Sequence, residues 1–456
     1  MTFKKTYYKL FILFISSSVF LVQSCSTNKN VIETNISKNK IDSQTDFIFQ
    51  KDAKWKKEAL HRIDSLRKRD LTIIVKDNKG NTIPNAQVKI KLNKHEFKFG
   101  AAIDKDLFNS PHSEKHKTLL KTYFNSSGFE NALKPKRRFS DTEAKAVPIM
   151  AWLQNNGFYM RGHALVWENR KNMRPEEKKA MNKKGTTNNQ KEKTVIKLAS
   201  RHFTHALNKW NVDCWDVLNE PIGNHQINDL TDRNTFGYWF KLADKVRKQN
   251  NKPNVKLFIN ENRIISGTTP NTYRRPDDYK KIIQSILDEN APLEGIGFQS
   301  RIKHNFVTPE QMLQRLRGFE EYNLPLHATE FEVRDTDVRT YTNEERSALI
   351  EQFMLIYVSH YLVDGIWHWT FYNNAKNSKP WALFNYDGSP TVSGKQWIKT
   401  METHFSANYN LTTNKKGELN KRVFKGEYTI NVNFKNKSKS IKATVSKNNT
   451  LTITLK

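Results

Sequence analysis

Two glutamates in this chain of 456 residues stand where a buried strand would end. Glu220 closes the segment Trp-Asp-Val-Leu-Asn-Glu and is followed by Pro221, and Glu330 closes the segment Leu-Pro-Leu-His-Ala-Thr-Glu. One carboxyl group can protonate a leaving oxygen while a second attacks an anomeric carbon, provided that the two lie about 5 to 5.5 Å apart. The pair is therefore a candidate for hydrolysis of a glycosidic bond with retention of configuration.

Glutamates so far apart in the chain can meet only where the fold brings the ends of their strands together. Between residues 97 and 405, short apolar segments alternate with helical stretches, which is typical of an α/β fold with a parallel (β/α)8 TIM barrel. In such a barrel the functional side chains lie at the carboxyl ends of the strands. Glu220 and Glu330 would end the fourth and seventh of eight expected strands, near residues 97–102, 124–130, 160–166, 213–219, 255–260, 294–299, 325–330 and 364–369.

Further β-rich segments flank the predicted barrel on both sides. Residues 71–75 and 86–92 are joined by a turn region containing Gly80 and Pro84, a pattern that predicts a strand pair. Three later segments alternate apolar and polar side chains, as antiparallel strands do, at residues 428–434, 440–445 and 450–455. Because neither end looks self-sufficient, we expect the N- and C-terminal segments to pair into one small accessory β module, a sandwich beside the barrel.

The N-terminus resembles the signal peptide of a bacterial lipoprotein. Lys4 and Lys5 precede an apolar run, and the run ends in Val22-Gln-Ser-Cys25. A small residue before a cysteine at this place resembles a lipobox, after which Cys25 would be acylated. We therefore expect an exported protein that is lipid-anchored at the bacterial outer membrane or cell surface. The alternative is a plain signal peptide with a chance cysteine.

The composition divides the rest of the chain. After the signal peptide comes a polar stretch that reads as a flexible tether. A stripe of Trp55, Ala59, Ile63 and Leu66 then predicts a helix. The expected parts are the signal peptide, the tether, an N-terminal helix with a β-hairpin, the barrel and a C-terminal β module, at residues 1–25, 26–52, 53–95, 96–407 and 408–456. Inside the barrel, the polar residues 183–193 predict a surface loop.

Several classes of protein are excluded by what the chain contains. The net charge of +30 comes from lysines spread along the whole sequence, and no zinc-ligand spacing accompanies them, so nucleic acid is not an expected partner. Besides Cys25 the only cysteine is Cys214, which excludes a disulfide scaffold. No phosphate-binding glycine loop or ligand cluster is found, so no cofactor or metal is expected. We expect a monomer.

The segments around the predicted strands resemble glycoside hydrolase family 10, the endo-xylanases. The longest match is Arg161-Gly-His-Ala-Leu-Val-Trp167, and the others follow in the family's order over roughly residues 97–400. They are Phe124-Asn125, Glu130-Asn-Ala-Leu-Lys134, Trp215 to Pro221, Gly295-Ile-Gly-Phe-Gln299, Thr329-Glu330 and Trp369. The segment Phe97-Lys-Phe-Gly100 and the arm before it are similar to plant-type members.

The resemblance implies a retaining endo-β-1,4-xylanase that acts on xylan or xylo-oligosaccharides by double displacement. It assigns Glu220 as general acid/base and Glu330 as nucleophile, the same two residues that strand position singles out. Asn219 would bond the 2-hydroxyl of the attacked sugar. The remaining implied contacts are His163, Gln299 and Trp369 at the same sugar, Glu130, Asn131 and Lys134 at the next sugar, and Trp167 against a ring face.

One departure from the family concerns the nucleophile. Many members carry a histidine after Gln299-Ser300, and that histidine contacts the nucleophile, whereas this chain has Arg301. The charge of an arginine is permanent. If Arg301 faces Glu330, it should favour the ionised carboxylate and lower the pKa of Glu330.

Other departures concern the sugar-binding positions. The family's usual residues are replaced by Pro135, by Glu168 and by Glu261-Asn262. No clear match exists for the second aromatic that covers the attacked sugar, and Trp381 and Tyr372 are the candidates for that place. Two other hypotheses therefore stay open: a barrel glycosidase acting on another β-1,4-glycan, and a non-catalytic surface lipoprotein that only binds glycan.

Overall fold

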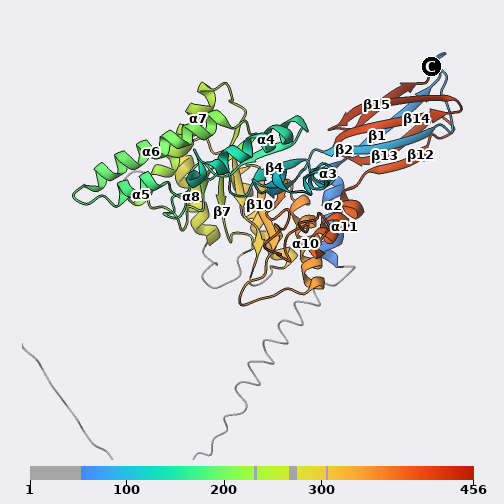
Figure 1. Ribbon diagram of the computed structural model, residues 1–456. Coiled ribbons are helices and arrows are strands. Elements are labelled where there is room, and N and C mark those ends of the chain that lie inside the picture. Colours follow the sequence, from blue (N-terminus) through green and yellow to red (C-terminus); the bar gives the residue numbers. More distant parts are fainter. Residues whose placement is uncertain (1–52, 231–233, 267–274, 304–306) are drawn as a thin grey trace, which may run out of the picture. The chain divides into compact units, whose positions relative to one another are not determined.

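The computed structural model describes residues 53–230, 234–266, 275–303 and 307–456, which belong to one compact unit (Figure 1). The expected signal peptide, the tether and the lipidation site Cys25 lie outside the described residues. None of the helices in the described ranges is both long enough and apolar enough to cross a membrane.

A closed barrel of eight parallel strands forms the centre of the part that the structure describes, as predicted (Figure 1). The ring closes because β11 pairs with β3, with Gly365 opposite Lys98 and His368 opposite Ala101. In barrel order the strands are β3 (Lys98–Ile103), β4 (Ser126–Phe129), β5 (Tyr159–Gly162), β6 (Cys214–Asn219), β7 (Lys256–Glu261), β8 (Gly295–Phe298), β10 (Leu326–Val333) and β11 (Val363–His368). A two-residue strand, β9 (Arg301–Ile302), extends the sheet beside the end of β10.

Large indoles fill the barrel where glycines leave room for them. A Cβ atom on Gly100 would lie 2.2 Å from the Trp367 ring, and one on Gly162 would lie 2.3 Å from the Trp215 ring. Both indoles are almost fully buried. A side chain at either glycine would therefore displace a tryptophan from the core.

Helices surround the barrel strands (Figure 1). They are α3 (Ser113–Tyr123), α4 (Asp141–Asn155), α5 (Pro175–Met181), α6 (Asn188–Lys209), α7 (Thr235–Gln249), α8 (Arg275–Asp288), α9 (Pro309–Arg317), α10 (Asn343–Val358) and α11 (Val392–Thr400). Several begin at a capping box; in α10 the Thr342 hydroxyl accepts from the Glu345 backbone N–H while the Glu345 carboxylate accepts from the Thr342 N–H. Such caps fix where each helix leaves the preceding loop.

The prediction of a surface loop at residues 183–193 is wrong in its second half. Helix α6 begins at Asn188, because Thr187 and Gln190 form a capping box and satisfy two helix-end N–H groups. The polar composition of this segment reflects an exposed helical turn rather than a loop.

The accessory β module combines both ends of the described chain, as predicted. One sheet has the order β13-β1-β16 and the other β12-β2-β14-β15. Their apolar faces are buried, for example at Ile73, Val88, Ile90, Ile430 and Val432. The bounds are β1 (Lys68–Lys76), β2 (Gln87–His95), β12 (Asn408–Thr412), β13 (Glu418–Phe424), β14 (Gly426–Phe434), β15 (Lys437–Val445) and β16 (Asn449–Thr454).

The expected hairpin between the first two strands is wrong. Apart from an isolated Lys76–Thr82 bridge, β1 pairs with β13 and β16, whereas β2 pairs with β12 and β14 in the other sheet. The alternating pattern of each strand identifies a half-buried strand but does not identify its neighbour. The partners come from the C-terminal segment, in which β12 and β13 were not predicted.

Helix α2 (Lys54–Arg67) joins the module to the barrel. Trp55, Ala59 and Ile63 are buried, as the predicted stripe requires. At its end the Arg67 guanidinium donates to the backbone oxygens of Val358, His360 and Val363 at 2.9, 2.6 and 2.5 Å. These bonds satisfy carbonyl groups between α10 and β11.

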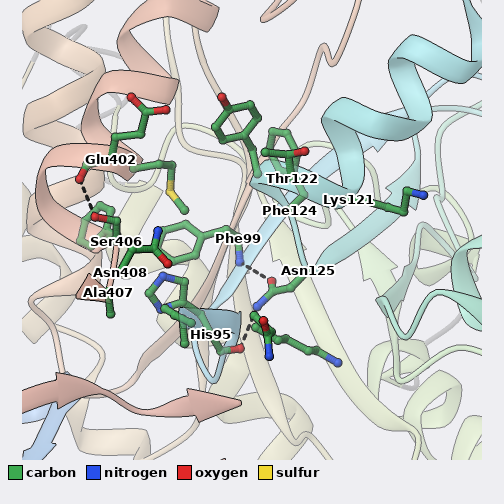
Figure 2. Close-up of a pocket in the computed structure, with 16 residues that line it drawn as sticks. His95, Phe99, Lys121, Thr122, Phe124, Asn125, Glu402, Ser406, Ala407 and Asn408 are labelled. Atoms are coloured by element: carbon green, nitrogen blue, oxygen red, sulfur yellow. Dashed lines mark hydrogen bonds between the residues drawn. The ribbon is translucent and has the colours of Figure 1, made fainter. Parts of the chain in front are cut away.

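A hollow of about 220 Å³ lies where the amino-terminal side of the barrel meets the accessory module (Figure 2). Phe99, Phe124 and Phe405 line it together with His95, whose pKa is lowered to about 4 by burial. Asn125 ties its wall together, accepting from the Phe99 N–H at 2.8 Å and donating to the His95 oxygen at 2.8 Å. None of the predicted site residues lines this hollow.

Candidate active site

The two predicted carboxyl groups lie at the carboxyl ends of barrel strands. Glu220 directly follows β6, where its backbone adopts a positive φ of 54° and its N–H donates to the Asn260 oxygen at 2.7 Å. Glu330 lies inside β10 and is only 2% exposed. The two carboxyl groups belong to one site, because the charge on Glu330 contributes to the raised pKa of Glu220.

The surroundings of Glu330 favour its ionised form. Arg301 Nη2 donates to Glu330 Oε2 at 2.5 Å, and Asn260 Nδ2 donates to Glu330 Oε1 at 3.3 Å. Burial by itself would raise the pKa of Glu330, but the charges of Arg301 and Lys134 oppose it, and the pKa lies below its usual value. A buried, ionised carboxylate with one oxygen held by a guanidinium has the form that a nucleophile needs.

The surroundings of Glu220 favour its protonated form. Burial raises the pKa of Glu220, and the negative charge of Glu330 raises it further. Gln299 Nε2 donates to Glu220 Oε1 at 2.5 Å, and Asn224 Nδ2 donates to Glu220 Oε2 at 3.3 Å; the bond from Gln299 lowers the pKa of Glu220 but offsets only part of the rise. The two carboxyl groups are therefore pushed toward opposite protonation states, which is the arrangement of an acid beside a nucleophile.

His163 follows β5 and lies beside Glu330. Its Nε2 is 3.9 Å from Glu330 Oε1, and its Nδ1 is 2.7 Å from Asp216 Oδ2. Burial holds the pKa of His163 well below its usual value. Arg161 also binds Asp216, so a buried ion pair fixes the orientation of the imidazole ring.

A cation and two indoles lie next to His163 in the wall of the site. Lys134 Nζ lies 5.1 Å from the ring centre of Trp167 and 5.2 Å from that of Trp369, and it donates to Asn131 Oδ1 at 3.0 Å. Burial lowers the pKa of Lys134 to about 8, which leaves the ammonium mostly charged at neutral pH. The Arg301 guanidinium lies 4.8 Å from the Trp369 ring on the side of Glu330. Flat apolar faces and donors thus alternate, as binding of a sugar requires.

Glu130 follows β4 at the same end of the barrel, and its N–H donates to the Ile103 oxygen at 3.0 Å. Burial, with the nearby charge of Asp104, raises the pKa of Glu130 to about 8. The raised pKa favours the protonated form of Glu130 at neutral pH, and this form can donate a hydrogen bond to a hydroxyl group.

Asn219 presents an unused donor to the site. Its Oδ1 accepts from Asn260 Nδ2 at 2.9 Å, while its buried Nδ2 has no hydrogen-bond partner in the part of the chain that the structure describes. A buried donor without a partner is costly, so this group is prepared for a ligand acceptor such as a sugar hydroxyl.

The two candidates for a covering aromatic lie at different places. Trp381 is partly exposed, and the Arg334 guanidinium lies 5.1 Å from its ring centre. Tyr372 is buried and packs its ring on His116 of α3 at 4.5 Å. Trp381 therefore keeps an accessible ring, whereas the ring of Tyr372 is used in packing.

Asn260 is a site residue that the sequence reasoning missed. It bridges Asn219 and Glu330, and its Oδ1 accepts from the Thr329 hydroxyl at 2.7 Å. It stands at the end of the predicted strand 255–260, so the rule that singled out the two glutamates could have found it.

Glu168 and Glu261, which replace the family's usual residues, bind the loop after Glu220. Both oxygens of Glu168 are used inside the protein: Oε2 accepts from the N–H groups of Ile227 and Asn228 at 3.0 and 2.9 Å, and Oε1 accepts from the Trp239 indole at 2.9 Å. Glu261 accepts from the Ile222 N–H at 2.9 Å. These glutamates thus hold the backbone of the loop that follows Glu220.

No group of three or more histidine, cysteine, aspartate and glutamate side chains could hold a metal ion among the residues that the structure describes.

Comparison with known proteins assigns the family. A family profile described as Glycosyl hydrolase family 10 matches residues 89–392. The chain belongs to this family. The solved structure of xylanase 10B from Thermotoga petrophila RKU-1 in complex with xylobiose is 18% identical and superposes with a TM-score of 0.54, covering 67% of this chain and 94% of that one. At this identity the likeness supports the fold alone.

Two of the curated relatives are longer than this family 10 chain. The anti-sigma-I factor RsgI6 of Acetivibrio thermocellus is 25% identical over 411 residues, covering 87% of this chain and 49% of that protein. Endo-1,4-beta-xylanase A of Thermotoga neapolitana is 27% identical over 315 residues, covering 62% of this chain and 28% of that protein. The chain thus spans about half or less of the length of these relatives.

Proposed function

We propose that this family 10 protein is a retaining endo-β-1,4-xylanase with Glu220 as acid/base and Glu330 as nucleophile. The observation that carries the proposal is the opposite perturbation of two neighbouring carboxyl groups: the pKa of Glu220 is raised and that of Glu330 is lowered. A non-catalytic glycan-binding protein would have no need of this pairing.

In the first step Glu330 attacks the anomeric carbon while Glu220 gives its proton to the leaving oxygen. The glycosyl ester that forms consumes the charge of Glu330. Because that charge contributes to the raised pKa of Glu220, the pKa of Glu220 then falls. Glu220 is thereby converted into a base that can deprotonate the incoming water in the second step.

The remaining side chains bind and orient the sugar. The free Nδ2 of Asn219 is proposed to bond the 2-hydroxyl, a contact that strengthens in the transition state. Trp369 and Trp167 offer apolar ring faces on either side of Lys134. His163, which burial keeps neutral, and Gln299 complete the wall near the two carboxyl groups.

The test is release of reducing ends from xylan, cellulose and mannan by the purified protein, with the anomer of the first product read by NMR. We expect cleavage of xylan with a β-anomeric first product. Cleavage of cellulose or mannan alone would replace the substrate assignment, and an α-anomeric first product would contradict the role of Glu330. Binding of xylo-oligosaccharides without any product would support the glycan-binding alternative.

We further propose that the protein is exported and lipid-anchored through Cys25. The support is the apolar run that ends in Val22-Gln-Ser-Cys25. Growth of the expressing bacterium with labelled palmitate should label the wild-type protein and leave Cys25→Ser unlabelled. Equal labelling of both would contradict the proposal.

A further inference from the structure

A group of cations lies along one side of the mouth. It consists of Arg263, Lys303 and Arg334, here called the cationic rim, with Arg301 behind it. Lys303 directly follows β9 and Arg334 directly follows β10, and the Arg334 N–H donates to the Ile302 oxygen at 2.8 Å, so their backbones are adjacent. Burial and the charges of Arg301, Arg334 and Arg263 lower the pKa of Lys303, and the single carboxylate of Glu332 opposes them. The rim follows strands on the far side of the barrel from β4 and Glu130.

The carboxylates near the rim already have hydrogen-bond or ion-pair partners. Glu332 is fully buried; its Oε2 accepts from the Thr370 hydroxyl at 2.9 Å, and its Oε1 lies 3.6 Å from both Arg301 Nε and Arg334 Nη1. The carboxylate of Glu330 is held by Arg301. The side chain of Lys303 forms no hydrogen bond or ion pair with any residue that the structure describes. The rim therefore carries more positive charge than its surroundings neutralise.

The rim also includes an accessible flat ring. The Arg334 guanidinium lies 5.1 Å from the Trp381 ring centre, and the side chain of Arg334 is 38% exposed. Trp381 is partly exposed as well. An arginine beside an indole can bind a carboxylate with two parallel hydrogen bonds while the indole supports a sugar ring.

Resting on the proposed xylanase function, we propose that the cationic rim binds a uronic acid side group of the xylan chain, so that acidic xylan is the preferred substrate. A neutral xylose chain offers no charge to balance Lys303 and Arg334. Among the described residues, Lys303 has no ion-pair partner and Arg334 has only the shared, buried Glu332. A uronic acid combines a second carboxylate for these cations with a ring that fits the face of Trp381. The excess positive charge of the rim thus makes the site favour acidic xylan over neutral xylan.

The experiment compares two polymers that differ only in charge: a glucuronoxylan, and the same glucuronoxylan after chemical reduction of its carboxyl groups to alcohols. Using the purified wild-type chain, we expect kcat/KM to be about tenfold higher on the acidic polymer at low ionic strength. The preference should shrink in about 0.5 M NaCl, because salt screens exposed charges. Equal values on both polymers would overturn the proposal, whereas lack of cleavage of either polymer and of linear xylo-oligosaccharides would contradict the xylanase function itself.

Variants connect the preference to the rim. In Arg334→Gln and Lys303→Gln the ratio of kcat/KM between the two polymers should fall toward one, and Arg334→Lys, which keeps the charge, should retain part of it. Lys447→Gln is the matched control, since Lys447 is an exposed lysine in a turn of the accessory module. An unchanged ratio in both glutamine variants of the rim, or an equal fall in Lys447→Gln, would overturn the proposal.

Discussion

Replacement of Arg301 by glutamine should move the acid limit of activity to higher pH. Arg301 Nη2 donates to Glu330 Oε2 at 2.5 Å, and its charge is among the causes of the lowered pKa of Glu330. Glu330 must be ionised to attack, so the rate falls as the pH drops through its pKa. Glutamine is polar but shorter than arginine, so the substitution removes both the permanent charge and the hydrogen bond to Glu330.

The size of the shift follows from the lost interaction. A hydrogen bond to a charged group contributes about 1.5 to 3 kcal/mol, and one pKa unit corresponds to about 1.4 kcal/mol. The pKa of Glu330 should therefore rise, and the acid limb of kcat/KM should move to higher pH by about 1 to 2 pH units. The alkaline limb, which we attribute to Glu220, should move less, because Arg301 acts on Glu220 more weakly than burial and Glu330 do.

The measurement is the pH dependence of kcat/KM on xylo-oligosaccharides, which reports the ionisation of the free enzyme. Arg301→Lys is the control, because it keeps the charge while changing the geometry. We expect the acid limb of Arg301→Lys to lie between those of the wild type and Arg301→Gln. An acid limb that stays in place in Arg301→Gln would refute the reasoning, since the charge facing Glu330 would then have no influence on the nucleophile.

Other predictions concern the same site and the attachment of α2. Glu220→Ala and Glu330→Ala should each lower kcat by about 10²- to 10⁴-fold with an unchanged melting curve; near-wild-type turnover in either would end the assignment of roles. Asn219→Ala should lower kcat/KM by about 10²-fold on xylo-oligosaccharides, mainly through kcat, and a pure KM effect would contradict a transition-state contact. A hydrogen bond from His404, aided by Lys56, lowers the pKa of Glu351 to about 2. Folding stability from this group is present above its ordinary pKa of 4.5 and is lost as the pH falls toward 2. Urea unfolding should show Glu351→Gln about 1 kcal/mol less stable at pH 7. Near pH 2 it should match the wild type, and a difference that persists there would contradict the ionic origin of the effect.

Strand position gave the central pair of the site without any knowledge of the fold family. Both glutamates follow an apolar run at the place where a barrel strand would end, and the closed sheet puts the ends of β6 and β10 at one face. Asn260 obeys the same rule but was missed, because an asparagine at a strand end carries no obvious chemistry until its two neighbours are known. Its bridge between Asn219 and Glu330 exists only in three dimensions.

The accessory module shows the limit of pattern reading. Alternation of apolar residues identified β1, β2, β14, β15 and β16 as strands, and the pairing of the two chain ends was predicted correctly. The pairing of β1 with β2 was predicted wrongly, because these two strands belong to different sheets. A period of two fixes which face of a strand is buried, whereas the neighbour depends on backbone groups that lie far away in the sequence.

The sequence alone determined the alternation of strands and helices, and with it a barrel whose strand ends carry two glutamates. Residue types and spacing suffice for this, because local periodicity and the position of a polar residue after an apolar run are properties of short segments. The tertiary structure decided the protonation of those glutamates. The pKa of a carboxyl group depends on burial and on charges within a few ångströms, and Arg301, Lys134 and Gln299 reach Glu330 and Glu220 from other strands. Two identical side chains thus acquire opposite tasks only when the barrel closes around them.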